Sequence, residues 1–187
     1  IPILLSLDGY KVTIIDKESL YNSELSIFSK VLKKFDIDSF NGDILQGGLN
    51  DLNTKFDAVN LTFVLEHLNG SPQELLLDIH KILKDSGKLI TTVPNHIRLA
   101  RRLGFLFGIS VHPVYRDYFY SKYPFSGHNR EYTASELRFC LENSNFQVCD
   151  LGSIKYKNGL LTMIANLLPK SFHQHIYAVS KKIHAVN

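Results

Sequence analysis

The sequence has 187 residues, enough for one domain with a hydrophobic core, and its 44% hydrophobic and 21% charged residues are ordinary for a globular protein. A net charge of +3, carried by scattered lysines and arginines, does not indicate nucleic-acid binding. The two cysteines have no metal-ligand spacing and do not make a disulfide scaffold, which favours a reducing, cytoplasmic setting. No apolar run is long enough to span a bilayer.

The first forty residues predict a helix, a strand, a second helix and a second strand. Residues 1–7 are apolar and precede Gly9, which is typical of a helix end, and residues 10–15 form a short β-branched run that stops at Asp16. Residues 18–35 place apolar side chains on one helical face, and 37–40 predict a strand. Because the chain begins with Ile1 in apolar sequence, we expect it to be a fragment that lacks a preceding segment.

Residues 56–63 are an apolar run followed by Glu66 and His67, which predicts a buried parallel strand with polar groups at its carboxyl end. Ser71, Pro72 and Glu74 predict a helix start with a capping box, and residues 88–93 predict the next strand. Right-handed crossovers between such strands give an α/β fold. We expect a Rossmann-like three-layer sandwich, with a mostly parallel twisted sheet and helices on both faces.

The second half of the chain begins with residues 96–127, which are rich in aromatics and arginines and predict a helix to about 108 followed by a loop. Thr133 and Glu136 predict a capping box at the start of a helix over 133–145. Residues 146–151 and 175–181 predict two final strands without a full crossover between them. This arrangement predicts an antiparallel last pair at the edge of the sheet.

Two carboxylates follow predicted strands where a nucleoside could bind. Asp16 can accept hydrogen bonds from ribose hydroxyls, or can cap the next helix. Asp43 lies in the loop after the second strand, where it can bind an adenine amine beside the Ile44 amide, or can simply be a turn residue.

Taken together, these blocks resemble class I S-adenosylmethionine-dependent methyltransferases. The likeness rests on YKVTIID, FNGDI, FDAVNLTFVLEHL, DSGKLITTVPN and HNREYTASELRFCLENSNFQV, and it covers nearly the whole chain as a single domain over 1–187. It implies S-adenosylmethionine as the cofactor. It also implies ribose binding by Asp16 beside Lys17, adenine binding by Asp43 and Ile44, and contact of Thr62 and Phe63 with the methionine part.

Two departures accompany this resemblance. The family's glycine-rich first motif is not found in the sequence, so we expect it upstream of Ile1 in the intact protein. Some relatives bind a metal between two acids and the histidine of the strand ending. Phe63 stands at the position of the earlier acid, so no metal is expected.

The catalytic candidates are Glu66, His67 and His128. His67 is the natural base, because an imidazole can accept a proton from a hydroxyl or amine acceptor near neutral pH, and Glu66 can orient His67 or face solvent. His128 can reach the site or can fix its loop. Arg130 can pair with an acidic substrate group, or with Glu131 or Asp117.

The insert over 96–127 is the predicted substrate lid. Tyr115 and Tyr118 can line an acceptor pocket, or can cover a sheet edge or a partner subunit. The arginines at 98, 101 and 102, beside apolar residues 103–107, are compatible with a membrane surface or a lipid-linked substrate, and equally with a helix that buries one face. The sequence sets no oligomeric state.

The sequence therefore predicts methyl transfer to a small-molecule acceptor, such as a glycan, a lipid-linked molecule or a quinone-like precursor. Two alternatives stay open. One is a nucleotide-binding α/β domain without catalysis, and the other is an NAD-type oxidoreductase, which the strand over 10–16 fits as well.

Overall fold

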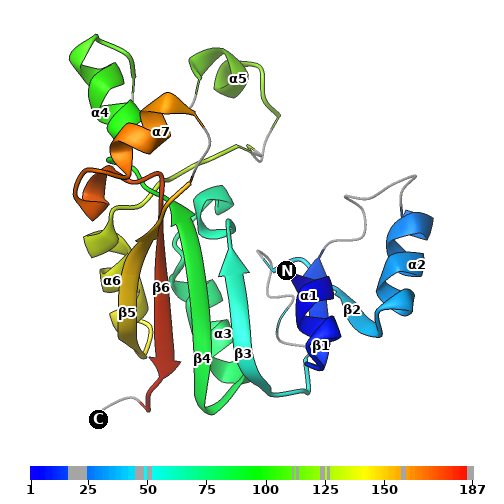
Figure 1. Cartoon of the computed structure of the whole chain (residues 1–187). Helices are drawn as coiled ribbons and strands as arrows, with labels where there is room; N and C mark the ends of the chain where they lie inside the picture. The colour runs from blue at the N-terminus through cyan, green and yellow to red at the C-terminus, as the bar shows by residue number, and fades with distance from the viewer. Residues whose placement is uncertain are drawn as a thin grey trace. The chain divides into compact units, whose positions relative to one another are not determined.

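The computed structural model describes residues 1–16, 25–44, 49, 52–110, 112, 114–122, 125, 127–156 and 159–184 (Figure 1). It divides into two compact units, Ile1–Asn53 and Thr54–Asn187. Each unit is considered by itself, and the single domain expected from the sequence stays a prediction. No helix among the described residues is long and apolar enough to cross a membrane.

In its described residues, the first unit contains two parallel strands and two helices. They are α1 (Pro2–Leu7), β1 (Val12–Asp16), α2 (Leu25–Lys34) and β2 (Ile37–Asn41). The predicted helix end is confirmed, and Gly9, with φ +86°, adopts the left-handed conformation that follows many helices. β1 and β2 run in register from Val12 opposite Ile37 to Asp16 opposite Asn41, so both strands end at the same edge.

The second unit holds a four-stranded mixed sheet in the order β3-β4-β6-β5. Its strands are β3 (Phe56–Thr62), β4 (Leu83–Pro94), β5 (Phe146–Ile154) and β6 (His175–Lys182). Its helices are α3 (Gln73–Ile82), α4 (Leu99–Leu106), α5 (Tyr115–Phe119), α6 (Ala134–Glu142) and α7 (Leu160–Ala165).

β3 pairs parallel with β4, whereas β6 runs antiparallel to both β4 and β5. The predicted antiparallel final pair is therefore confirmed, and β5 is the edge strand. β6, the last strand in the sequence, lies between β4 and β5. The α/β fold with a mostly parallel sheet and an antiparallel last strand is also confirmed, because β6 runs against the direction shared by β3, β4 and β5.

Helices α3 and α6 supply the apolar side chains that cover the sheet, and both lie behind its strands in the view of Figure 1. Leu76 and Ile79 of α3 and Leu137 and Leu141 of α6 are at most 1% exposed. Burying a side chain of this size stabilises the fold by about 1.5–3 kcal/mol. The core of this unit therefore lies between the two helices and the sheet.

The predicted buried strand over 56–63 is only partly correct, because Leu61 is the one fully buried residue of β3. The other residues of β3 are less buried because β3 is an edge strand of the four-stranded sheet. The chain then bends sharply at Phe63, which has φ +56°, a conformation that strains a bulky side chain. Its amide donates to the Thr92 carbonyl at 2.9 Å, which holds the bend against β4.

One of the two predicted capping boxes is present. The Thr133 hydroxyl accepts from the Glu136 amide, and the Glu136 carboxylate accepts from the Thr133 amide at the start of α6. At α3, the helix begins at Gln73 instead. The Ser71 hydroxyl accepts only the Gln73 amide at 3.2 Å, so no box with Glu74 is found.

The insert over 96–127 contains two helices, one more than the sequence predicted. α4 ends at Leu106 and is followed by the short α5. Both lie beyond one end of the four-stranded sheet, together with α7 (Figure 1).

Candidate functional site

Glu66 is the most unusual side chain at the carboxyl end of β3. It lies in the 3-10 turn Leu65–His67 and has no exposed surface. Neither carboxylate oxygen has a hydrogen-bond partner in the described part of the chain. Burial raises the pKa of Glu66, because the charged form loses its hydration. A buried, unpaired carboxyl of this kind costs stability and is typical of functional sites.

Two imidazoles lie beside this carboxyl. The rings of His67 and His128 meet edge to face, with their centroids 4.9 Å apart. One possible ligand atom from each of Glu66, His67 and His128 lies within 4.8 Å of the others, so these three residues could hold a divalent cation. Phe63 offers no ligand, and its ring contacts His175 instead, with a centroid separation of 4.9 Å.

The protonation of His67 follows from its neighbour. Its Nδ1 lies 3.1 Å from the Gly127 carbonyl oxygen, which can only accept a hydrogen bond. Nδ1 therefore carries the hydrogen, and the lone pair of the neutral ring is on Nε2.

His128 is oriented by Glu131, a carboxylate that the sequence did not single out as a site residue. Nδ1 of His128 lies 3.4 Å from Glu131 Oε1, a long contact. Glu131 also accepts from Arg98 at 2.5 Å and from Arg101 at 3.1 Å. Burial works to raise the pKa of Glu131, but the hydrogen bond and charge of Arg98 and the charge of Arg101 outweigh it and lower the pKa.

The segment that carries His128 is pinned directly to the end of β3. The Asn129 and Arg130 amides both donate to the Glu66 carbonyl, at 2.7 and 3.3 Å. The Asn129 side chain donates to the His67 carbonyl at 3.2 Å. These bonds explain why residues more than 60 positions apart form one cluster.

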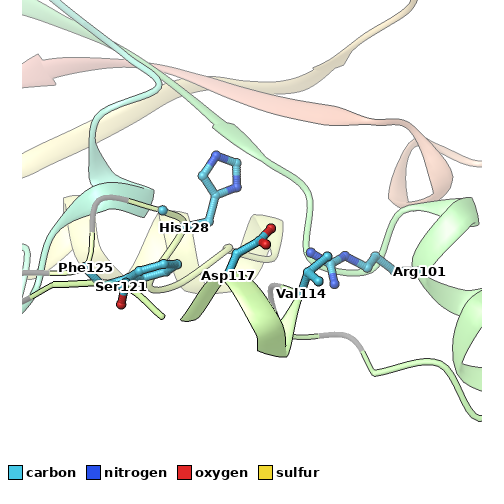
Figure 2. A pocket seen from close by; sticks show the side chains of 7 residues that line it. Arg101, Val114, Asp117, Ser121, Phe125 and His128 are labelled. Carbon is cyan, nitrogen blue, oxygen red and sulfur yellow. The ribbon is translucent and has the colours of Figure 1, made fainter. Parts of the chain in front are cut away.

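His128 also lines an open pocket of about 460 Å³. Figure 2 shows Asp117 between His128 and Arg101, with Phe125 on the opposite side of His128. The other residues of the lining are Val114, Ser121 and Gly127. The pocket is built mainly by residues of the insert over 96–127. That this insert is a substrate lid stays a prediction.

The predicted substrate residues lie around this pocket rather than in its lining. Tyr115 and Tyr118 are on α5, 72% and 57% exposed, whereas Asp117 of the same helix lines the pocket. Arg130 pairs with Glu136 at 2.8 Å, so neither acid expected from the sequence is its partner.

His175 lies near Thr62 and Phe63, and the sequence did not indicate it as a site residue. Thr62 donates to the Asn60 side chain at 2.6 Å. His175 packs between Phe63 and Tyr156, and its buried Nδ1 has no partner in the described part of the chain. Burial, together with the nearby charge of Arg98, lowers the pKa of His175, so this ring is held neutral.

In the first unit, Asp16 ends β1 and Asp43 follows β2 by two residues. Because β1 and β2 are parallel neighbours with Asp16 opposite Asn41, both carboxylates lie at the same sheet edge. The Gly42 amide donates to the Asp16 carbonyl at 3.2 Å, which fixes the loop that carries Asp43 and Ile44. Lys17 lies outside the described residues.

Comparison with known proteins shows the family of the chain. A family model described as a methyltransferase domain matches residues 7–151. The chain belongs to this methyltransferase family. No curated protein matches the methyltransferase significantly in sequence.

Solved structures share the fold of the methyltransferase at low identity. A SAM-dependent methyltransferase from Methanosarcina mazei is 14% identical with a TM-score of 0.60, over 98% of this chain and 87% of that one. A putative O-methyltransferase from Nostoc punctiforme is 16% identical with a TM-score of 0.58, over 96% of this chain and 47% of that one. Human N-acetylserotonin methyltransferase, solved with SAM, is 18% identical with a TM-score of 0.53, over 95% of this chain and 42% of that one.

The methyltransferase thus spans less than half of several similar structures. The family match confirms the resemblance drawn from its residues, and the structural neighbours confirm the Rossmann-like α/β fold. Together they support S-adenosylmethionine as the cofactor.

Proposed function

We propose that this methyltransferase transfers a methyl group from S-adenosylmethionine to a small-molecule acceptor, and that His128 takes the proton that the acceptor loses. The observation that carries the proposal is the position of His128, which contacts the Glu131 carboxylate on one side and lines the pocket on the other. Family membership supports the reaction class. A cytoplasmic setting stays our expectation, since Cys140 and Cys149 are both free thiols.

The residues present fit the cofactor. Asp16 and Asp43 place two carboxylates at one edge of parallel strands, as hydrogen-bond acceptors for ribose hydroxyls and an adenine amine require. The Ile44 amide would lie against the adenine, and Lys17 adjoins the ribose-binding residue. That Thr62 and Phe63 contact the methionine part stays a prediction from the sequence. When bound, S-adenosylmethionine supplies a methyl group activated by a sulfonium charge.

The protein's task in such a transfer is to position the acceptor and remove its proton. As the methyl group supplied by S-adenosylmethionine would join the acceptor oxygen or nitrogen, the proton of that atom would pass to Nε2 of His128. The Glu131 carboxylate then stabilises the imidazolium through Nδ1, and the proton leaves to water. Glu66 and His67 complete the polar wall of the site, beside His128.

The pocket supports a small acceptor. Its volume of about 460 Å³ falls in the lower part of the range of about 300–1,000 Å³ that is usual for ligand pockets. Phe125 offers an aromatic face, while Arg101 and Asp117 offer one charge of each sign. Tyr115, Tyr118 and Arg130 are proposed to contact acceptor groups that extend beyond the pocket.

Cofactor affinity tests this function against its alternatives. We expect calorimetry to detect S-adenosylmethionine binding, and Asp16→Ala to weaken it by about 10- to 150-fold, since hydrogen bonds to a charged group contribute about 1.5–3 kcal/mol. Asp38→Ala is the matched control, because Asp38 lies on β2 and pairs only loosely with Lys11 at 3.6 Å. Binding of NAD instead would favour an oxidoreductase, and binding without turnover would favour a non-catalytic domain.

Chelation tests how the cluster of Glu66, His67 and His128 is used. With His128 as the proton acceptor, we expect methyl transfer to be unchanged after dialysis against EDTA. Added Mn²⁺ or Zn²⁺ should then inhibit, because a cation held by these donors removes the lone pair of His128. Loss of activity on chelation and its return with one divalent ion would instead assign the cluster to a metal that acts as a Lewis acid.

A further inference from the structure

Helix α4 places arginines toward the domain and several large apolar side chains toward solvent. Its arginines turn toward the domain, where the side chains of Arg98, just before the helix, and Arg101 are 20% and 18% exposed in their pairing with Glu131. Arg102 donates to the Ile97 carbonyl and stacks over the Phe172 ring at 4.1 Å. Among the apolar residues of α4, Leu99 is buried, whereas Leu103, Phe105 and Leu106 are exposed. An ordinary surface helix has the opposite arrangement.

The exposed apolar residues gather at one end of the second unit. Phe105, Leu106 and Phe107 at the end of α4 are 68%, 76% and 81% exposed. Leu160 at the start of α7 is 77% exposed, and Leu167 just after this helix is 88% exposed. Most of the large apolar side chains exposed in the described chain lie within residues 103–120 and 160–168.

These segments lie together. Helices α4 and α7 contact each other, and α5 lies beyond the same end of the sheet (Figure 1). We call this surface the α4–α5–α7 face. Soluble monomers rarely expose a contiguous apolar patch of more than a few hundred Å², and larger patches are interaction sites.

Charge indicates which partner fits the face. Arg116, Lys122 and Lys170 are exposed on the same segments. Residues 99–122 and 159–172 contain a single acid, Asp117. Two copies of such a face would repel each other, whereas an anionic surface would attract both. Tyr115, Tyr118 and Tyr120, 57–78% exposed, have rings of the amphipathic kind that favours a membrane interface.

We propose that the α4–α5–α7 face binds peripherally to an anionic lipid bilayer. The apolar tips of α4 and α7 insert at the level of the headgroups, and Arg116, Lys122 and Lys170 contact the lipid phosphates. This binding requires neither cofactor nor acceptor and so does not depend on the proposed methyl transfer. It would bring the pocket, which Val114 and Asp117 of the same insert line, close to the bilayer.

Vesicle co-sedimentation of the full chain tests the proposal. We expect binding to phosphatidylcholine vesicles that contain 30% phosphatidylglycerol, at least tenfold weaker binding to pure phosphatidylcholine, and weaker binding at high salt. The double variant Phe107→Ser/Leu167→Ser should bind at least tenfold more weakly. Because both side chains are over 80% exposed, its fold should be intact by circular dichroism.

The matched control is Phe139→Ser, an aromatic residue 66% exposed on α6, which should bind as the unmodified chain does. Equal loss in control and double variant, or no binding to anionic vesicles, would overturn the proposal. A dimer in analytical ultracentrifugation that Phe107→Ser/Leu167→Ser dissociates, without vesicle binding, would assign the face to a second copy of the chain.

Discussion

Replacing His128 by alanine should lower kcat for methyl transfer by about 100- to 10,000-fold, the contribution typical of a positioned general base. The loss follows from the geometry, because His128 is the imidazole that both contacts an ionised carboxylate and lines the pocket. Affinity for S-adenosylmethionine should not change, since the proposed cofactor contacts are elsewhere. Single-turnover rates and calorimetry on the same preparations separate the two quantities.

Two further variants make this result specific. His112→Ala removes an exposed histidine of the same insert and should leave kcat unchanged. Added imidazole should restore part of the activity of His128→Ala if the ring acts only as a base. A large loss in His67→Ala together with near-normal turnover in His128→Ala would assign proton acceptance to His67 and reject His128.

Glu131→Gln should lower the free energy of unfolding by about 3–5 kcal/mol at pH 7, because removing one partner from a buried ion pair leaves the other unpaired. The Glu131 side chain is 5% exposed and holds both Arg98 and Arg101. Denaturant unfolding measures the change. Glu142→Gln is the control, because its exposed pair with Arg138 is worth only about 0.3–0.5 kcal/mol.

The pH dependence of this difference has a defined sign. The pKa of Glu131 is lowered in the folded chain, so its charge stabilises the fold at any pH above its ordinary value of 4.5. The stabilisation is lost as the pH falls below 4.5 and through the lower folded value. The gap between the unmodified chain and Glu131→Gln should therefore shrink below pH 4.5. A gap that stays constant there would mean that packing, not charge, accounts for the loss.

Much of the local structure was predictable from short patterns. Thr133 and Glu136 have the spacing of a capping box, and the box is present. Ser71 and Glu74 have the same spacing, but the chain enters α3 one residue later than the box requires. The strand that ends at Asp16 was also predictable from a short pattern, because a run of β-branched residues favours a strand.

The candidate site was predictable only in part. Glu66 and His67 adjoin the end of an apolar strand, so their neighbourhood could be inferred from position. The role of Glu131 could not, because it depends on Arg98 and Arg101, which lie 33 and 30 residues earlier. The only available signal was the spacing of these arginines on one helical face, and it fitted a surface patch equally well.

The sequence by itself determined the α/β class and most of the order of the elements, because these follow from local periodicity and helix caps, and its resemblance to known methyltransferases indicated the family. Only the tertiary structure decided that the arginines flanking and within α4 turn inward and its phenylalanines outward. The reason is that buried Glu131 requires cations beside it, and only the folded chain brings Arg98 and Arg101 to it. The same packing places His128 against the pocket and leaves the α4–α5–α7 face apolar.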